Sequence, residues 1–466
     1  TCLKNKGSAV RFCLWPPKLS INYYNLVEAL KMIIKKKYLL FQSLTLSIGF
    51  VIYFANKLPS FLDEFVSLSS HYFFITEFDL RSPIGGEENL PITSFSPGLT
   101  SVFNSSIGGA ISWLFIKDFY TSRIFNFIFT IFQLNLLNLF AFKKKLINEV
   151  FVILSNLSIF LIPWWFGSLY GLGEVSACLI FFYGILFYES NKKISLLLIS
   201  FSIFFGKFIL LLSFLVLFFF NLRKDGLKVF LYSLVVPIFW QTIIFFKLGN
   251  EGYINYLISY KSFLFSQGVG NTILNTNFMN FIQFIIKSEI SEWTAATLLR
   301  AVIVPFVLFL ILFKMRKNSN FLIQNFQLII LINYVYFFLF SQYKWIRYAQ
   351  PFLIFTIFLI LYIVTVDQRT SFNIKFLTLI LLLLFLSSDL LIILGLLSLS
   401  LTRLKNLKIN FNLSLILIFL LSLNILNLLY ESLSIPIYQT FYNTCSIENF
   451  TLNCALDYME QISLSD

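Results

Sequence analysis

Residues 58–99, LPSFLDEFVSLSSHYFFITEFDLRSPIGGEENLPITSFSPGL, are one of two long polar interruptions in an otherwise largely apolar chain. They follow an apolar run, 38–56, and contain the only histidine of the chain, His71. We therefore expect the apolar segments to form a scaffold that holds this acidic loop in place. The six carboxylates of the stretch are Asp63, Glu64, Glu77, Asp79, Glu87 and Glu88.

The composition of the whole chain points to a membrane protein. Of its 466 residues, 58% are hydrophobic and only 12% are charged. Several apolar runs reach the roughly 20 residues that cross a bilayer, and backbone in lipid must be helical. The sequence thus predicts an all-α fold, a polytopic transmembrane bundle of about 11–13 spans. The net charge of +13 comes from lysines in short loops, which orient membrane helices, so we expect no nucleic-acid partner.

The predicted spans leave two kinds of ambiguity. Segments 194–220 and 374–400 are long enough for one tilted helix or two short ones. Segment 98–116 is rich in small and polar residues, so it either crosses or dips into the membrane. The full set of predicted spans is 38–56, 98–116, 121–142, 147–166, 174–189, 194–220, 227–247, 297–313, 323–341, 348–366, 374–400 and 411–430.

Domain organisation follows from the spans and their flanking charges. Residues 32–430 form the predicted transmembrane domain, with a first outer loop at 57–97 that bears short interfacial helices, and a second outer loop at 248–296. Basic loops, such as the one holding Arg223 and Lys224, are expected on the cytoplasmic side. Residues 1–31 are expected to be disordered or to precede a natural start at Met32. The tail 431–466 is expected outside, where Cys445 and Cys454 bridge if the compartment is oxidising.

Asp63 and Glu64 are the predicted catalytic residues. They directly follow the first span and open an amphipathic stretch that includes His71 and Tyr72. A carboxylate at the boundary of water and lipid is partly desolvated, which raises its pKa and makes it a better base. The alternative is structural: Asp63 caps a short helix and Glu64 lies in its first turn.

Glu77 and Asp79 are a second acidic pair, spaced so that their oxygens could share a divalent cation. A solvated loop is the competing interpretation, because two oxygen ligands are too few to define a site. His71 has no second histidine to complete a zinc site. We therefore predict no metal or other cofactor, with a divalent cation at Glu77 and Asp79 as a weak alternative.

Charged residues within or beside apolar runs form a third group of candidates. Lys207 and Glu174 lie in apolar runs, where a charge usually has a function but is also usually paired. Arg123 opens the span 121–142, and Lys344, Arg347 and Tyr348 form a basic aromatic cluster. Arginine suits phosphate recognition, whereas a membrane-interface anchor of Trp, Tyr and Arg is the competing interpretation of that cluster.

Over residues 32–366 this pattern resembles the GT-C superfamily of integral-membrane glycosyltransferases, in the group of protein O-mannosyltransferases and aminoarabinose transferases. The resemblance rests on Asp63-Glu64 after a first span and on the acidic-x-acidic motif Glu77-Phe78-Asp79. Further along, the segments ITSFSPGLTSVF (92–103), TSRIFNFIF (121–129), SLYGLGEVSACLIFF (168–182) and YKWIRYAQPF (343–352) are similar to segments of such proteins.

The resemblance implies transfer of a hexose or pentose from a polyprenyl-phosphate donor to a hydroxyl of a lipid, glycan or protein. It implies an inverting reaction on the extracytoplasmic face of a bacterial inner membrane, with membrane lipids as further partners. Asp63 would be the general base, Glu64 would orient the acceptor or bind sugar, and cations would stabilise the leaving phosphate. The implied substrate-binding residues are His71, Tyr72, Glu77, Asp79, Arg123, Tyr170, Glu174, Lys207, Lys344, Arg347 and Tyr348.

Two other function classes remain open from the sequence. A flippase or exporter of lipid-linked saccharides would also need charges within the membrane. A polymerase or ligase of such saccharides would place its site at the second outer loop, 248–296, which holds Glu251, Lys261, Glu289 and Glu292 but no cluster of arginines.

Overall fold

The computed structural model describes residues 36–55, 57, 62–77, 106–161, 164–171, 173–203, 210–264, 295–315, 320–337, 346–386, 389–404 and 409–433. The predicted leader 1–31, most of the tail, and the candidates Asp79, Lys207 and Lys344 lie outside these residues. The same holds for Cys445 and Cys454.

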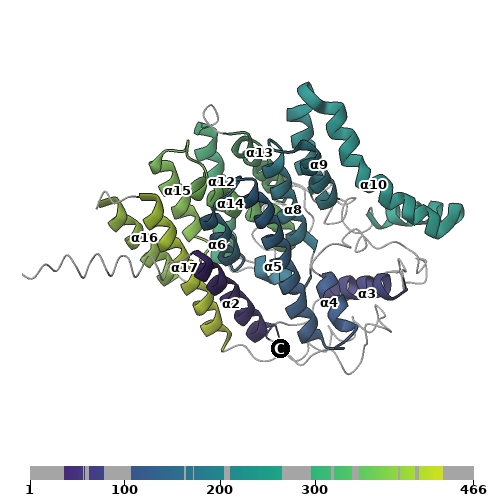
Figure 1. Cartoon of the computed structure of the whole chain (residues 1–466), viewed down its shortest axis with the longest axis horizontal. Coiled ribbons are helices and arrows are strands. Elements are labelled where there is room, and N and C mark those ends of the chain that lie inside the picture. The colour runs from purple at the N-terminus through teal and green to yellow at the C-terminus, as the bar shows by residue number, and fades with distance from the viewer. Residues whose placement is uncertain are drawn as a thin grey trace, which may run out of the picture.

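Within the described residues every regular element is a helix, which confirms the predicted all-α class. The helices pack into one bundle from which α3 and α10 project at one side (Figure 1). In chain order they are α2 (Lys36–Phe54), α3 (Leu62–Glu77), α4 (Ser106–Trp113), α5 (Phe119–Lys143), α6 (Glu149–Ser158), α7 (Trp164–Leu169), α8 (Gly173–Phe187), α9 (Lys192–Phe201), α10 (Leu211–Leu264), α12 (Ala295–Met315), α13 (Phe321–Val335), α14 (Ile346–Thr365), α15 (Phe372–Leu383), α16 (Asp389–Leu404) and α17 (Ile409–Ser432).

Several helices begin with the same kind of N-cap hydrogen bond. A side-chain oxygen at the N-cap accepts a hydrogen bond from the backbone N–H three residues further on, which satisfies a donor that the helix itself leaves open. This places short polar residues at the ends of apolar runs. The caps are Asp118 for α5, Asn148 for α6, Asn191 for α9 and Asn320 for α13.

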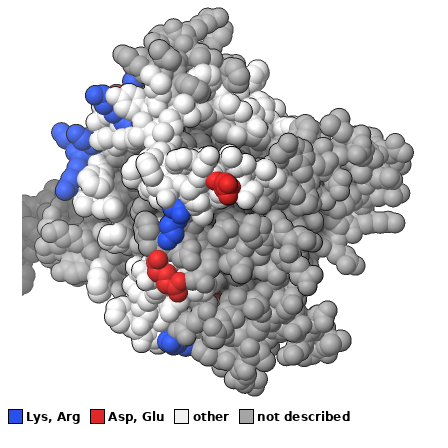
Figure 2. Space-filling model, turned by 90° about the vertical axis from the view of Figure 1, so that its right-hand side faces the viewer, with Lys and Arg blue, Asp and Glu red and all other residues white. Residues whose placement is uncertain are grey.

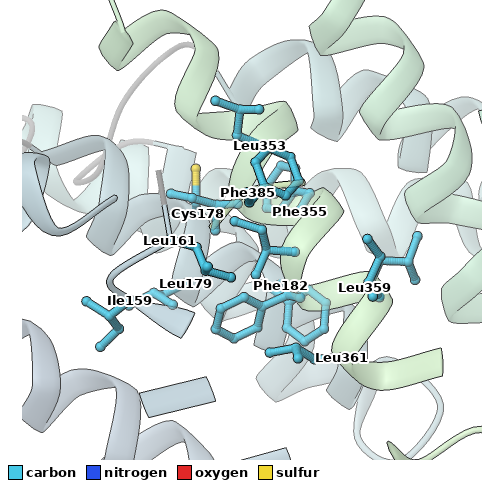
Figure 3. Packing of buried hydrophobic residues seen from close by; sticks show 14 of the residues in the cluster. Ile159, Leu161, Cys178, Leu179, Phe182, Leu353, Phe355, Leu359, Leu361 and Phe385 are labelled. Atoms are coloured by element: carbon cyan, nitrogen blue, oxygen red, sulfur yellow. The ribbon is translucent and has the colours of Figure 1, made fainter. Parts of the chain in front are cut away.

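Helix α14 is the centre of the bundle. It contacts α6, α7, α8, α12, α13, α15 and α17, and every residue from 349 to 361 is buried. A helix without an exposed polar face must be surrounded by other elements. Its aromatic side chains meet those of α8, where the rings of Phe182 and Phe358 lie 5.0 Å apart. Figure 3 shows Phe182 of α8 in one packed cluster with Phe355 and Leu359 of α14.

Three predicted spans are divided in the structure. The segments 194–220 and 374–400 each contain parts of two helices, α9 and α10 in the first, α15 and α16 in the second. The two-helix alternative is therefore the correct one for both. The prediction of one span over 147–166 is wrong, because α6 ends at Ser158 and α7 begins at Trp164. Pro163, which cannot continue a helix from the preceding turn, lies between them.

Helix α10 corrects two further predictions. It is helical through Arg223 and Lys224, where a loop was expected, and it continues to Leu264, well into the predicted outer loop 248–296. The chain reverses within it at Gly249, whose φ is +68°. Tyr253 Oη donates to Gln241 Oε1 over 2.9 Å, whereas twelve residues of straight helix span about 18 Å.

Among the described helices, two have the length and composition to cross a bilayer, within Phe119–Lys143 and Ser414–Glu431. Eight further apolar stretches of 10–17 residues lie within the other described helices, so these helices do not establish the predicted number of about 11–13 spans. In the 98–116 segment, α4 has 8 residues. That is about 12 Å of helix. Residues 98–105 lie outside the described ones, so whether this segment crosses or dips into the membrane stays a prediction.

Candidate functional site

Helix α3 is the described part of the acidic loop, and it confirms the short helix expected after the first apolar run. It lies across the direction of α5 and beside α4 (Figure 1). Because it begins at Leu62, Asp63 and Glu64 both lie in its first turn, and Asp63 is not the capping residue. The far end of α3 reaches α10, where the rings of Phe74 and Trp240 lie 6.2 Å apart.

Glu64 and Arg123 form a buried, two-pronged ion pair between α3 and α5. Arg123 Nε donates to Glu64 Oε1 over 2.6 Å and Nη2 donates to Oε2 over 2.8 Å. Both residues are at most 3% exposed. The remaining nitrogen, Nη1, donates to the carbonyl of Ala55 over 2.8 Å. One guanidinium thus ties α3, α5 and the end of α2 together, in the planar geometry that makes such pairs strong.

The α7–α8 turn packs against the same face of α5. The guanidinium of Arg123 lies 5.0 Å from the centroid of the Tyr170 ring, a cation–π contact. One turn along α5, Asn126 Nδ2 donates to the carbonyl of Leu169 over 3.0 Å, and Asn126 Oδ1 accepts from the N–H of Gly109 over 2.8 Å. The structure therefore brings together three of the sequence candidates, Glu64, Arg123 and Tyr170, in a contact that the sequence analysis did not predict.

Glu174 lies in the first turn of α8 and is buried at 1% exposure. It follows Tyr170 by four residues, after a turn in which Gly171 adopts a φ of +67°. A carboxylate is favoured at this end of a helix by the helix dipole. Its predicted alternative partner, Lys207, lies outside the described residues, so that pairing stays a prediction.

The remaining candidates on α3 differ in their environments. His71 is fully buried, and its Nδ1 lies 2.6 Å from the carbonyl oxygen of Ser67. Because a carbonyl only accepts, Nδ1 carries the proton. Tyr72 is partly buried and Glu77 is exposed at the end of the helix. Within the described chain, no group of three or more His, Cys, Asp or Glu side chains is placed to hold a metal ion.

Arg347 and Tyr348 lie in the first turn of α14, but their side chains, like that of Asp63, are not among the described ones. The next residues on the same helix include a group that the sequence analysis missed. Gln350 is 1% exposed, and neither its Nε2 nor its Oε1 has a hydrogen-bond partner. The available signal was a single amide inside the apolar run YAQPFLIF.

The amide of Gln350 lies against helix α7. A Cβ atom on Gly167 would be 2.5 Å from Gln350 Nε2 and 2.9 Å from Val175 Cγ2. Only a glycine lets the amide come this close to the helix backbone. Gly167 lies about one helical turn before Tyr170, so the Gln350 amide and the Arg123 ion pair flank the same short segment.

No protein-family model, no curated protein and no solved structure matches this chain.

Proposed function

We propose that this chain is a polytopic integral-membrane glycosyltransferase of the GT-C type. It would move a sugar from a polyprenyl phosphate to an acceptor hydroxyl on the extracytoplasmic face of the membrane. The observation that carries the proposal is the buried Glu64–Arg123 pair. It fixes the first turn of α3, and with it the acidic pair, against α5 and the end of α2.

The membrane location is supported by where apolar side chains lie. Large hydrophobic residues are exposed along several helices, including Phe132 on α5, Phe246 on α10 and Leu390 on α16. Contiguous exposed apolar surface marks membrane or partner contact in folded proteins. Figure 2 shows a face on which most described atoms are uncharged and the coloured charges are few. Shorter helices that pack in series would let the bundle span more lipid than any one of them.

The ion pair makes Glu64 a positioning residue in this proposal. Its carboxylate already engages Arg123, so the role of base falls to its neighbour Asp63. The pair fixes the backbone from which Asp63 projects, and pre-organisation of this kind is a large part of catalysis. Arg123 in turn holds Glu64, so stabilisation of the donor phosphate would fall mainly to Lys207 and Arg347.

The proposed reaction is a single displacement with inversion. The Asp63 carboxylate takes the proton of the acceptor hydroxyl, and the acceptor oxygen forms a bond to the anomeric carbon. The bond between that carbon and the phosphate oxygen breaks on the opposite face, and its electron pair leaves with the polyprenyl phosphate. Nearby cations stabilise the charge that develops there.

The test is transfer of a radiolabelled sugar from a panel of glycosyl polyprenyl phosphates by the full chain in membranes. Asp63→Asn should lower transfer by about 100-fold or more, the usual contribution of a general base, while leaving membrane insertion unchanged. Asp389→Asn is the matched control, because Asp389 is an exposed carboxylate in the first turn of α16. Near-normal transfer by Asp63→Asn would refute the assignment, and lipid translocation without transfer would favour a flippase.

A further inference from the structure

We infer that Gln350 is the residue that recognises the sugar of the lipid-linked donor, through a hydroxyl that bonds its buried amide beside Gly167. The inference rests on the proposed function and assigns its specificity to one side chain. Neither amide atom of Gln350 has a hydrogen-bond partner, although the residue is 1% exposed. A buried amide in this state destabilises the ligand-free fold, so its presence calls for an explanation.

Other buried amides in the described helices are bonded. Asn126 uses both of its polar atoms, and Asn156 exchanges hydrogen bonds with Asn135. Gln327 donates to the carbonyl of Phe309. Among these described amides, Gln350 alone has both atoms without a partner. The bundle therefore satisfies amides as a rule, and the exception lies beside the candidate site.

The Gln350 amide packs closely against Gly167. Any side chain larger than hydrogen at this position would meet Gln350 Nε2, 2.5 Å from the Cβ position. The same short segment continues to Tyr170, whose ring covers the Arg123 guanidinium. The amide and the ion pair thus belong to one assembly, built from α3, α5, the α7–α8 turn and the start of α14.

The hydrogen-bonding groups of the Gln350 amide indicate which part of the lipid-linked donor it can bind. A carboxamide offers both a donor and an acceptor, and a sugar hydroxyl has the same pair of functions. A phosphate mainly accepts and prefers cations, and a polyprenyl chain offers neither. Gln350 is therefore suited to distinguish a glycosylated carrier from the bare carrier lipid.

The test uses the full chain in nanodiscs and two probes, a glycosyl polyprenyl phosphate and the same polyprenyl phosphate without sugar. We expect the wild type to prefer the glycosylated lipid, and Gln350→Leu to lower that preference by about tenfold, which corresponds to the loss of one buried hydrogen bond. Gln350→Leu should also raise the Tm of the ligand-free protein, by roughly 1 °C for a chain of this length, because an apolar side chain of similar size replaces the unsatisfied amide.

Gln327→Leu is the matched control, since Gln327 is equally buried but its amide is bonded. It should lower the Tm and leave the preference for the glycosylated lipid unchanged. An unchanged preference in Gln350→Leu, or a lower Tm as in Gln327→Leu, would overturn the inference alone. A wild type that binds neither lipid would overturn the proposed function as well.

Discussion

Two regions differ in whether their buried polar side chains have hydrogen-bond partners. The first is the contact between α3 and α5, and the second is the start of α14. At the first, the Glu64 carboxylate and the Arg123 guanidinium are bonded to each other, and the guanidinium also binds the end of α2 and covers an aromatic ring. At the second, the Gln350 amide is equally buried and has no hydrogen bond. The comparison separates polar groups that hold the fold together from one to which we assign a ligand.

The physical reason for the difference is the cost of burial. Two opposite charges that lose water must pair with good geometry, or the fold does not tolerate them. A neutral amide without partners costs much less, so a protein can keep one for binding. We thus expect ligand binding at the amide, whereas the ion pair stabilises the fold and positions Asp63.

The largest expected effect is that of Arg123→Met. It leaves the Glu64 carboxylate buried without its partner, which should lower the free energy of unfolding by about 3–5 kcal/mol. Thermal or denaturant unfolding in detergent measures it. In the double variant Glu64→Leu with Arg123→Met most of this loss should be recovered, because no charge remains buried. A double variant as unstable as the single one would show that the pair is not the source of the loss.

Asn126→Leu tests the second tie between α5 and its neighbours. It removes the acceptor for the Gly109 N–H and the donor to the Leu169 carbonyl. Each of the two orphaned backbone groups costs about 1–3 kcal/mol, so we expect a loss of at least about 2 kcal/mol in unfolding free energy. A loss below about 0.5 kcal/mol would mean that α4 and the α7–α8 turn are held by other contacts.

Gly109→Ala probes the close approach of α4 to α5. The added methyl group would overlap Asn126 Oδ1 and lie 3.0 Å from the Ser122 carbonyl oxygen, and such overpacking costs about 1–3 kcal/mol. Gly49→Ala in α2 is the matched control, because its Cβ would meet nothing within 4 Å. That control should be neutral or stabilising by up to about 1 kcal/mol, from helix propensity. Equal effects of the two changes would contradict this packing.

The smallest expected effect on stability has the opposite sign. Gln350→Leu should raise the free energy of unfolding by about 1 kcal/mol, because the unsatisfied amide is replaced by an apolar group of similar volume. The unfolding free energies of Gln350→Leu and Arg123→Met, measured in the same denaturant series, should change in opposite directions. Both positions are buried, and only Arg123 is bonded.

The sequence predicted what local pattern controls. Apolar runs indicated most of the helices, and an amphipathic stretch after the first run indicated α3. The capping residues were not predicted, and the one cap considered, Asp63, lies inside α3 instead. The sequence also selected Glu64, Arg123 and Tyr170 as candidates, but it did not place Glu64 against Arg123. These residues are 59 positions apart, and such a contact depends on how whole helices cross.

Other features were out of reach for related reasons. From hydropathy, residues 147–166 were predicted to be one span because the apolar character continues across Pro163. A loop was predicted at Arg223 because charges interrupt the apolar run there. Gln350 belongs to no sequence motif. Its distinguishing feature is the lack of hydrogen-bond partners, which the sequence does not show. Unsatisfied groups can be recognised only after the surrounding helices are in place.

The central claim is that the donor sugar is bound beside α7 and the start of α14. The most direct measurement is photo-crosslinking of the full chain in nanodiscs with a polyprenyl phosphate whose sugar carries a diazirine, followed by mass spectrometry of the peptides. We expect adducts within residues 164–174 and 346–352 that disappear when unlabelled glycosyl polyprenyl phosphate is added. Competable adducts confined to α16 and α17, with none in those two segments, would contradict it.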